Sequence, residues 1–407
     1  MTTTPPPARV LSGMRPTGQL HLGNYHGALK NWVALQQRYD CFFFIADWHA
    51  LTTGYEDTSA LQQHIGAMVV DWLAAGLDPQ RAAIFVQSGV TAHAELHLLL
   101  SMITPLPWLE RVPTYKDQQA QLQDRDLATY GFLGYPLLQS ADILVYRPAW
   151  VPVGEDQVAH VEMTREVARR FNHFYGKDAQ FAGQVKQALG RLDPAVRGQL
   201  GELRKAHGQS GDAEAPGKAR ALLEEAAGST PADRKLLSDW IAGDVHQLLP
   251  APEVLLTPTP KVPGLDGRKM SKSYGNTIGL TEDPESIAKK IRGMQTDPAR
   301  VRRNDPGDPE KCPVWDLHKL YSDEPVRRWV QQGCRSAGIG CLECKKPLVE
   351  RIAGEAVQMR ERAAPYLANP GLVREILAAG AERANAVAGE TMQVVREAMN
   401  LVSRIEP

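Results

Sequence analysis

Two short segments, far apart in the sequence, combine glycines with basic residues in ways that suit phosphate binding. Residues 12–24 read SGMRPTGQLHLGN and join an expected strand to the start of an expected helix. Such a junction presents unpaired backbone N–H groups and the positive end of a helix, so it suits an anion such as a triphosphate. Residues 269–273 read KMSKS in a loop flanked by glycines. Its two lysines, Lys269 and Lys272, could close over a polyphosphate.

Each segment alone also has a purely structural explanation. The first could be a tight glycine turn with a helix cap, and the second could be a solvated basic loop. The spacing of Gly13, Gly18 and Gly23 is neither G-x-G-x-x-G nor that of a P-loop, which argues against the ordinary dinucleotide and NTPase motifs. The segments therefore indicate a function only when they are taken together.

Together, the two segments resemble the paired signatures of the class I aminoacyl-tRNA synthetases. Residues 21–24, HLGN, are similar to the HIGH signature, and residues 269–273 match the KMSKS signature in full. Asn24 replaces the last histidine of HIGH, and asparagine there is typical of the tryptophan enzymes of this family. Residues 12–18, 135–144 (YPLLQSADIL) and 151–157 (VPVGEDQ) also look like stretches of the bacterial tryptophanyl-tRNA synthetases. The resemblance covers residues 9–170 and 260–401.

The resemblance implies an activity and partners. The family activates L-tryptophan with ATP, accompanied by Mg²⁺, to tryptophanyl-AMP and pyrophosphate, and then transfers tryptophan to the terminal ribose of its tRNA. A homodimer is also implied. Lys269 and Lys272 would stabilise charge on the departing pyrophosphate, and His21 would lie near the phosphates. The nearest alternative is a tyrosyl-tRNA synthetase, and an alternative of a different class is a non-catalytic relative that binds RNA or senses redox state.

The resemblance also assigns residues to a tryptophan pocket. Asp142 would accept the indole N–H, a group that can only donate. Because an unpaired buried carboxylate is costly, a ligand without that donor would be rejected by about 10⁴–10⁵-fold. Taken singly, Asp142 could instead be a helix-surface or capping aspartate. The other residues implied are Tyr135 and Gln157 at the α-amino group, His49 and Gly13 near it, and Gln139, which stands where many relatives have methionine.

The nucleotide would bind between the two signatures. Gly154 would let the backbone approach the ribose, and Asp156 would accept hydrogen bonds from the sugar hydroxyls. The implied ATP-binding residues are Arg15, Pro16, Thr17, Gly23, Asn24, Gly154, Glu155, Asp156, Val262, Lys269, Met270, Ser271, Lys272 and Ser273.

Four of the five cysteines, Cys312, Cys334, Cys341 and Cys344, are clustered with the spacing C-x21-C-x6-C-x2-C. Four thiolates of this kind suit zinc or an iron–sulfur cluster, and the alternative is four unrelated buried thiols. The pattern resembles that of a subset of tryptophanyl-tRNA synthetases with a 4Fe-4S cluster, which we therefore expect in preference to Zn²⁺. The basic side chains Arg335, Lys345 and Lys346 could offset its charge and face tRNA phosphates. Cys41 lies alone in an apolar run and is expected to be a buried thiol.

A second candidate metal pair is less convincing. His93 and His97 are four residues apart on an expected helix, but Glu95 projects away from their shared face and no third ligand is apparent. We interpret both histidines as structural.

Composition is that of a globular protein. Apolar residues make up 43% and charged residues 23% of the 407-residue chain. The 46 basic and 47 acidic side chains balance, so any RNA must be met by a local basic surface. Residues 1–8 lack the apolar segment of a signal peptide, which predicts a disordered lead and a cytoplasmic protein.

The pattern of apolar residues predicts an α/β fold that positions these groups. Buried strands are expected at residues 9–12, 41–46, 83–87 and 151–153, alternating with helices at 22–38, 58–75, 92–102 and 158–171, with Thr58 and Thr91 as N-caps. The expected domains are a Rossmann-like parallel-sheet catalytic domain (9–174), a helical insertion (175–250) with a mobile centre at 207–218, the KMSKS loop region of the catalytic domain (251–282), and an all-α anticodon-binding domain (283–407). The last helix could pack back on the catalytic domain.

Overall fold

A computed structural model describes residues 8–112, 128–176, 179–210, 212, 214–241, 247–257 and 261–401. At its centre lies a parallel sheet with the strand order β3-β2-β1-β4-β5. Its strands are β1 (Arg9–Met14), β2 (Asp40–Ile45), β3 (Ala82–Val86), β4 (Trp150–Val153) and β5 (Glu253–Leu256). The four strands expected from the sequence are present within about two residues of their predicted ends. The sequence did not predict β5, a short edge strand with exposed ends.

Strand β2 is apolar after Asp40, and β3 is apolar throughout, because helices cover both faces of the sheet. On β2, Cys41, Phe43 and Ile45 face one apolar core, and Phe42 with Phe44 face the other. Cys41 is fully buried, as predicted. The α/β fold class predicted from the alternation of strands and helices is therefore confirmed.

The first core contains the helical run that follows β1. This run comprises α1 (Leu22–Asn24), a π-helical turn η1 (Tyr25–Leu29) and α2 (Lys30–Leu35), and α4 (Leu61–Ala75) packs beside it. The predicted cap at Thr58 is wrong, because α4 begins at Leu61 with Ala60 in the cap position. The side chain of Thr91 does not cap the next helix, although Thr91 occupies its N-cap position.

The second core lies on the opposite face. Its helices are α5 (Ala92–Ser101), α6 (Leu106–Glu110), α8 (Tyr130–Leu144) and α9 (Val158–Tyr175), with α3 (Asp47–Gly54) and the 3-10 turns η2 (Gln87–Gly89) and η3 (Glu155–Gln157) at the ends of the strands.

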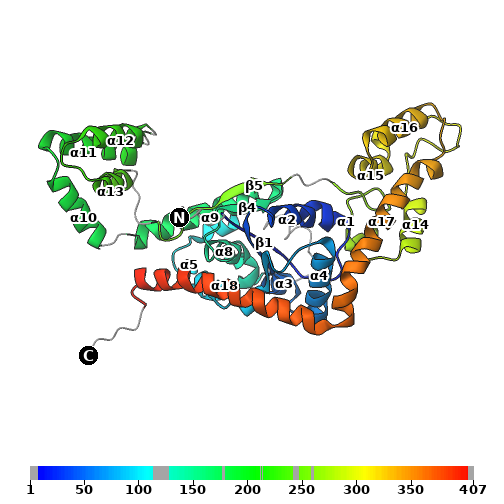
Figure 1. Cartoon of the computed structure of the whole chain (residues 1–407), viewed down its shortest axis with the longest axis horizontal. Coiled ribbons are helices and arrows are strands. Elements are labelled where there is room, and N and C mark those ends of the chain that lie inside the picture. The colour runs from blue at the N-terminus through cyan, green and yellow to red at the C-terminus, as the bar shows by residue number, and fades with distance from the viewer. Residues whose placement is uncertain are drawn as a thin grey trace, which may run out of the picture.

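The segment between α9 and β5 forms a helical unit with its own apolar core, apart from the sheet (Figure 1). Its helices are α10 (Ala179–Gly190), α11 (Pro194–Ser210), α12 (Ala215–Glu225) and α13 (Pro231–Ile241). The side-chain amide of Asn172 pairs with both backbone groups of Leu249, at 2.7 and 3.0 Å, so the two ends of this unit lie together. The mobility expected for residues 207–218 stays a prediction; residues 211 and 213 lie outside the described residues.

The rest of the chain is mainly helical. After the short turn η4 (Lys272–Tyr274) come α14 (Pro284–Gly293), η5 (Pro309–Lys311), α15 (Pro313–Tyr321), α16 (Glu324–Arg335), α17 (Cys341–Ala368) and α18 (Pro370–Ala398). Helix α18 returns to the body of the protein that holds the sheet (Figure 1), and there it packs against the edge strand β3. A Cβ at Gly380 would lie 1.9 Å from the Ile84 carbonyl oxygen, so glycine is what permits this close approach. In the part of the chain that the structure describes, no helix is long and apolar enough to cross a membrane.

Candidate active site

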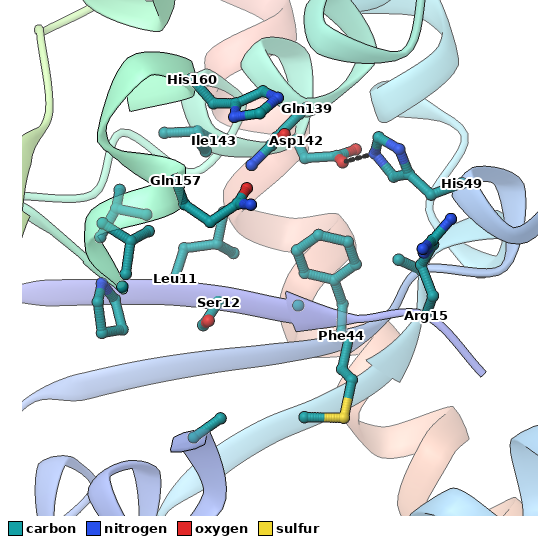
Figure 2. A pocket seen from close by; sticks show the side chains of 18 of the residues that line it. Leu11, Ser12, Arg15, Phe44, His49, Gln139, Asp142, Ile143, Gln157 and His160 are labelled. Carbon is teal, nitrogen blue, oxygen red and sulfur yellow. Dashed lines mark hydrogen bonds and ion pairs between the residues drawn. The ribbon is translucent and has the colours of Figure 1, made fainter. Parts of the chain in front are cut away.

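A cavity of about 340 Å³ opens at the carboxyl ends of β1 and β4 (Figure 2). The strand order reverses between these two strands, and in open parallel sheets this is where ligands bind. The wall comes from the ends of β1, β2 and β4, from the π-helical turn and from α8. The cavity is thus built by elements that are distant in sequence but meet at one edge of the sheet.

The residues expected to bind tryptophan all line this cavity: Gly13, His49, Tyr135, Gln139, Asp142 and Gln157. Of the expected ATP-binding residues, Arg15 and Gly154 also line it. Glycine is needed at position 13 because a Cβ there would lie 2.4 Å from the Phe44 ring. The side chain at this position must be absent for the ring to form the cavity floor.

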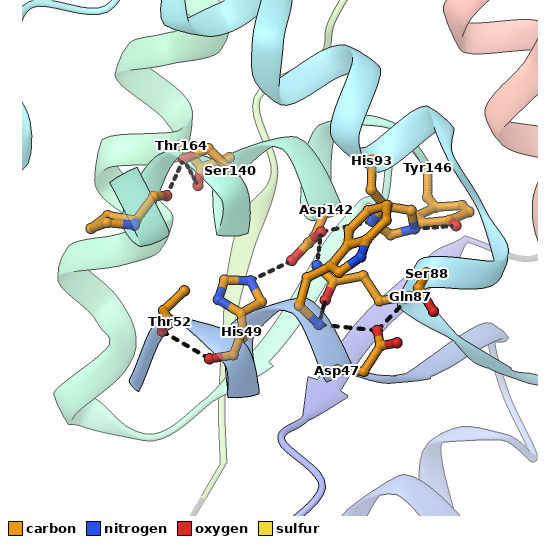
Figure 3. A network of polar contacts seen from close by, with 12 residues as sticks. Asp47, His49, Thr52, Gln87, Ser88, His93, Ser140, Asp142, Tyr146 and Thr164 are labelled. Carbon is orange, nitrogen blue, oxygen red and sulfur yellow. Dashed lines mark hydrogen bonds and ion pairs between the residues drawn. The ribbon is translucent and has the colours of Figure 1, made fainter. Parts of the chain in front are cut away.

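Asp142 is fully buried on α8 and holds the densest set of polar contacts in the site (Figure 3). His49 Nε2 lies 2.8 Å from Oδ2, and His93 Nδ1 lies 2.7 Å from Oδ1. Gln87 Nε2 donates to the same Oδ1 at 2.7 Å. Burial by itself would raise the pKa of Asp142, but the hydrogen bonds from His49 and His93 outweigh it and hold the pKa below its ordinary value. The alternative of a helix-surface or capping aspartate is therefore wrong.

The HIGH-like segment forms the start of α1. His21 is the N-cap, its Nδ1 accepts from Gly23 N at 3.1 Å, and Asn24 Oδ1 accepts from His21 N at 3.1 Å. Asparagine in place of histidine thus closes a reciprocal capping box. Burial, followed by the nearby Lys272, lowers the pKa of His21 to about 4. The imidazole is neutral near pH 7, and because Nδ1 accepts, its proton lies on Nε2.

The KMSKS loop lies directly against this helix start. Lys272 Nζ donates to the Thr17 carbonyl oxygen at 2.7 Å, and Leu22 N donates to Ile278 O at 3.0 Å. Met270 is buried, with its N–H donating to Val262 O at 3.0 Å, which anchors the loop to the core. The structure therefore brings the two signatures together at the helix start that follows β1.

Several expected nucleotide residues do not line the cavity itself. Lys269, Lys272 and Ser273 are exposed, and Ser271 donates its N–H to Asn276 Oδ1 at 2.8 Å. Pro16, Thr17, Gly23, Asn24 and Glu155 lie outside the wall as well. The side chain of Asp156 lies outside the described residues. The phosphate-binding role of these residues stays a prediction.

A buried carboxylate supports the junction of the two signatures. Asp71, on α4, accepts a hydrogen bond from Leu20 N at 2.6 Å. Burial raises its pKa to about 6, and both this hydrogen bond and the charge of Lys272 oppose that rise. Asp71 therefore holds the backbone that leads into His21.

Sequence reasoning missed the site roles of four residues: Gln87, His93, Tyr146 and His160. Gln87 directly follows β3, and a polar residue at the carboxyl end of a parallel strand was a usable signal. His93, interpreted only as structural, contacts Asp142 and also Tyr146, and no spacing rule links these three residues. His160 lines the cavity from the first turns of α9.

The four clustered cysteines lie at the ends of helices. Cys312 caps α15, Cys334 closes α16, and Cys341 with Cys344 forms the first turn of α17. Burial, and then the other three thiols, raise the pKa of Cys344 to about 12. Arg300 Nη1 lies 3.8 Å from Cys334 Sγ. Among the described residues no group of three or more ligands stands close enough to hold a metal ion, although four thiols are the donor set that a soft metal prefers.

The expected basic surface around these cysteines is only partly present. Arg335 and Lys346 are exposed. Lys345 is buried instead, and its ammonium donates to the Arg292 carbonyl oxygen at 2.8 Å and to that of Met294. The expectation that Lys345 could face tRNA phosphates is therefore wrong, because its charge is used to close α14 against α17.

The sheet order and the position of the cavity define a Rossmann-like, nucleotide-binding class of protein. Comparison with known proteins narrows this class. The sequence matches the family described as tRNA synthetases class I (W and Y) over residues 3–197 and 235–354, and the chain belongs to this family.

Similar proteins span nearly the whole chain. A tryptophan–tRNA ligase from Ralstonia nicotianae is 59% identical over 97% of this chain and 99% of its own length. Another from Thermotoga maritima is 43% identical with the same coverage. Among solved structures, tryptophanyl-tRNA synthetase from Campylobacter jejuni complexed with ADP and tryptophan is 30% identical, with a TM-score of 0.69 over 96% of this chain and 99% of that one.

Proposed function

We propose that this chain is a tryptophan–tRNA ligase. The observation that carries the proposal is its likeness, at 59% identity and almost full length, to a protein of that activity. The site agrees with it, since a buried carboxylate at the end of the cavity offers the acceptor that an indole N–H requires. The tryptophan and ADP bound by the Campylobacter jejuni protein fit a site of this kind.

In the first step, the tryptophan carboxylate attacks the α-phosphorus of ATP, and the bond to pyrophosphate breaks. In the second, a hydroxyl of the terminal ribose of tRNA attacks the carbonyl of the adenylate and releases AMP. ATP enters with Mg²⁺, which accompanies polyphosphates. No side chain acts as a nucleophile, so the protein accelerates both steps by positioning and by stabilising charge.

The substrates are assigned to the two parts of the site. Tryptophan occupies the cavity, with its α-amino group toward Tyr135 and Gln157 and its indole toward Asp142. The nucleotide lies between Gly154 and the start of α1, where neutral His21 can donate from Nε2 to a phosphate oxygen. Lys269 and Lys272 contribute mobile positive charge, and Lys272 exchanges its contact with Thr17 for the phosphates.

The deciding experiment is exchange of labelled pyrophosphate into ATP by the purified protein. We expect exchange with tryptophan and none above background with tyrosine, followed by charging of tRNA(Trp). Exchange with tyrosine alone would make the chain a tyrosyl-tRNA synthetase. No exchange with either amino acid would favour a non-catalytic RNA-binding or redox-sensing relative.

We further propose that the active form is a cytoplasmic homodimer. Exposed apolar side chains gather on the adjoining helices α5, α6 and α8: Leu98 (55% exposed), Met102 (68%), Leu106 (59%) and Tyr130 (64%). Such a group usually marks a protein interface. Light scattering should give the mass of a dimer, and Met102→Glu should yield monomers. Leu367→Glu, at an exposed site on α17, is the control and should remain dimeric.

The last proposal concerns the four clustered cysteines. We propose that they hold a 4Fe-4S cluster, supported by the position of the four thiols at the ends of three helices, of which α17 contacts the other two, and by the positive charge of Arg300. When bound, such a group would supply structural cross-linking of α15, α16 and α17. Protein purified without oxygen should contain about four irons and four sulfides and absorb visible light. Stoichiometric zinc without that absorbance would identify a zinc site, and absence of both metals would leave four free thiols.

A further inference from the structure

The two oxygens of the Asp142 carboxylate are not equivalent. Oδ1 faces two donors, Gln87 Nε2 and His93 Nδ1, each at 2.7 Å. Among the described residues, Oδ2 faces only His49 Nε2, at 2.8 Å. An ionised carboxylate has about four acceptor positions, two on each oxygen. Oδ1 is therefore saturated, and Oδ2 retains one position for a ligand.

An ionised Asp142 carboxylate fixes the direction of the hydrogen bond that joins it to His93. An ionised carboxylate can only accept, so His93 Nδ1 must donate to it. A neutral imidazole then accepts at Nε2 from the Tyr146 hydroxyl, 2.7 Å away, whereas a protonated one donates to that hydroxyl. Both His93 and Tyr146 are fully buried, so bulk water does not compete for these bonds (Figure 3).

The side chains behind Oδ1 are fixed by contacts with the protein core and not by contacts in the cavity. The Tyr146 ring stacks on Phe42 at 5.3 Å, and its backbone oxygen accepts from Arg9 Nη1 at 2.6 Å. The Gln87 amide has a fixed orientation, because its oxygen accepts from Trp48 N at 3.1 Å. His93, Tyr146 and Gln87 do not belong to the cavity wall, so they can reach a ligand only through Asp142.

With the indole N–H donating to Asp142 as in the proposed function, we propose that Oδ2 is the accepting oxygen, and that His93, held by the Tyr146 hydroxyl, is a positioning residue that keeps this oxygen toward the cavity. The inference rests on the proposed function, because it assumes that tryptophan is the ligand. It assigns a role in specificity to two residues that touch no substrate, with Gln87 as the second anchor of Oδ1.

The test compares tryptophan with its benzothiophene analogue, in which sulfur replaces the indole N–H. For each variant, pyrophosphate exchange gives kcat/KM for both substrates, and the measured quantity is the ratio of the value for tryptophan to the value for the analogue. Tyr146→Phe removes one hydroxyl and keeps the ring, so the ratio should fall by about tenfold. His93→Leu removes the donor to a charged group, and the ratio should fall by about tenfold to a hundredfold. His93→Asn keeps a donor near the Nδ1 position and should recover part of the ratio.

The matched control is Ser140→Ala, on the same helix. Ser140 is also fully buried and hydrogen-bonded, to Thr164 Oγ1 at 3.0 Å and to the Pro136 carbonyl oxygen at 3.0 Å, but it does not contact Asp142. It should leave the ratio unchanged. If Tyr146→Phe lowers kcat/KM equally for both substrates, or leaves both unchanged, the positioning role is wrong. A wild-type protein without tryptophan-dependent exchange would instead refute the proposed function.

Discussion

At the scale of single residues, Lys272 links the two signatures before any nucleotide is present. Its ammonium donates to the Thr17 carbonyl oxygen. The proposed phosphates would attract the ammonium away from this contact. Lys272→Ala should lower the rate of pyrophosphate exchange by about 10²–10³-fold, since one cation aimed at developing charge is lost. The KM for tryptophan should change little, because Lys272 lies outside the cavity.

The control for this prediction is another cation of the same loop. Arg268 is exposed, and its guanidinium is already paired with Asp266 at 2.7 Å. Arg268→Ala should therefore keep nearly all of the exchange activity. Equal losses in the two variants would mean that the loop needs only general positive charge, and that Lys272 has no specific role.

The burial of His26 should make the stability of the folded protein depend on pH. It is buried against the Tyr321 ring, 4.9 Å away, and in the described structure its Nε2 has no hydrogen-bond partner. Burial, and then the charge of Lys30, lower its pKa to about 4. The unfolded chain binds a proton near pH 6.5 and the folded chain only near pH 4, so stability declines as the pH falls through this window.

The expected loss from His26 between pH 7 and pH 5 is about 2 kcal/mol. His26→Phe keeps a ring against Tyr321 but cannot take up a proton, so urea unfolding of this variant should depend less on pH by that amount. His173→Phe, at an exposed histidine, should keep the wild-type pH dependence. A His26→Phe profile parallel to that of the wild type would contradict the assignment.

At the scale of elements, the contact between α18 and β3 depends on one missing side chain. Because a Cβ at Gly380 would overlap the backbone of Ile84, Gly380→Ala should destabilise the protein by about 1–3 kcal/mol through overpacking. Gly389 lies on the same helix with open space around it. There, Gly389→Ala should stabilise by up to about 1 kcal/mol, through helix propensity alone. Changes of opposite sign in the free energy of unfolding of the two variants, measured with urea, would separate the effect of packing from that of helix propensity.

The sequence predicted those elements whose pattern of apolar residues is contained within the element itself. Residues 41–46 are apolar throughout, which predicted a covered parallel strand, and β2 follows it. Strand β5 escaped notice because it is short, half exposed and flanked by prolines. The chain Asp142–His93–Tyr146 was not predictable, since it joins two helices and the residue beyond one of them through side-chain geometry. For the cysteines, spacing predicted that they cluster but could not supply their relative positions.

At the scale of the whole molecule, the helical unit formed by α10 to α13 should be dispensable for amino-acid activation. It has its own core, and the Asn172–Leu249 pair keeps its two ends together. Replacing residues 177–246 with a short glycine–serine linker should leave tryptophan-dependent exchange unchanged. Charging of tRNA, measured in parallel, would show whether the unit serves the second step. Loss of exchange in a folded deletion variant would make the unit part of the catalytic machinery.

The return of α18 to the edge of the sheet also bears on how the protein is made. The ribosome releases β3 long before it releases α18, which places Ala384, Ala388 and Met392 in the second core. Until α18 has been synthesised, the nascent sheet has an open flank where a foreign strand could pair. Chaperone binding to stalled chains should therefore drop sharply once α18 has emerged.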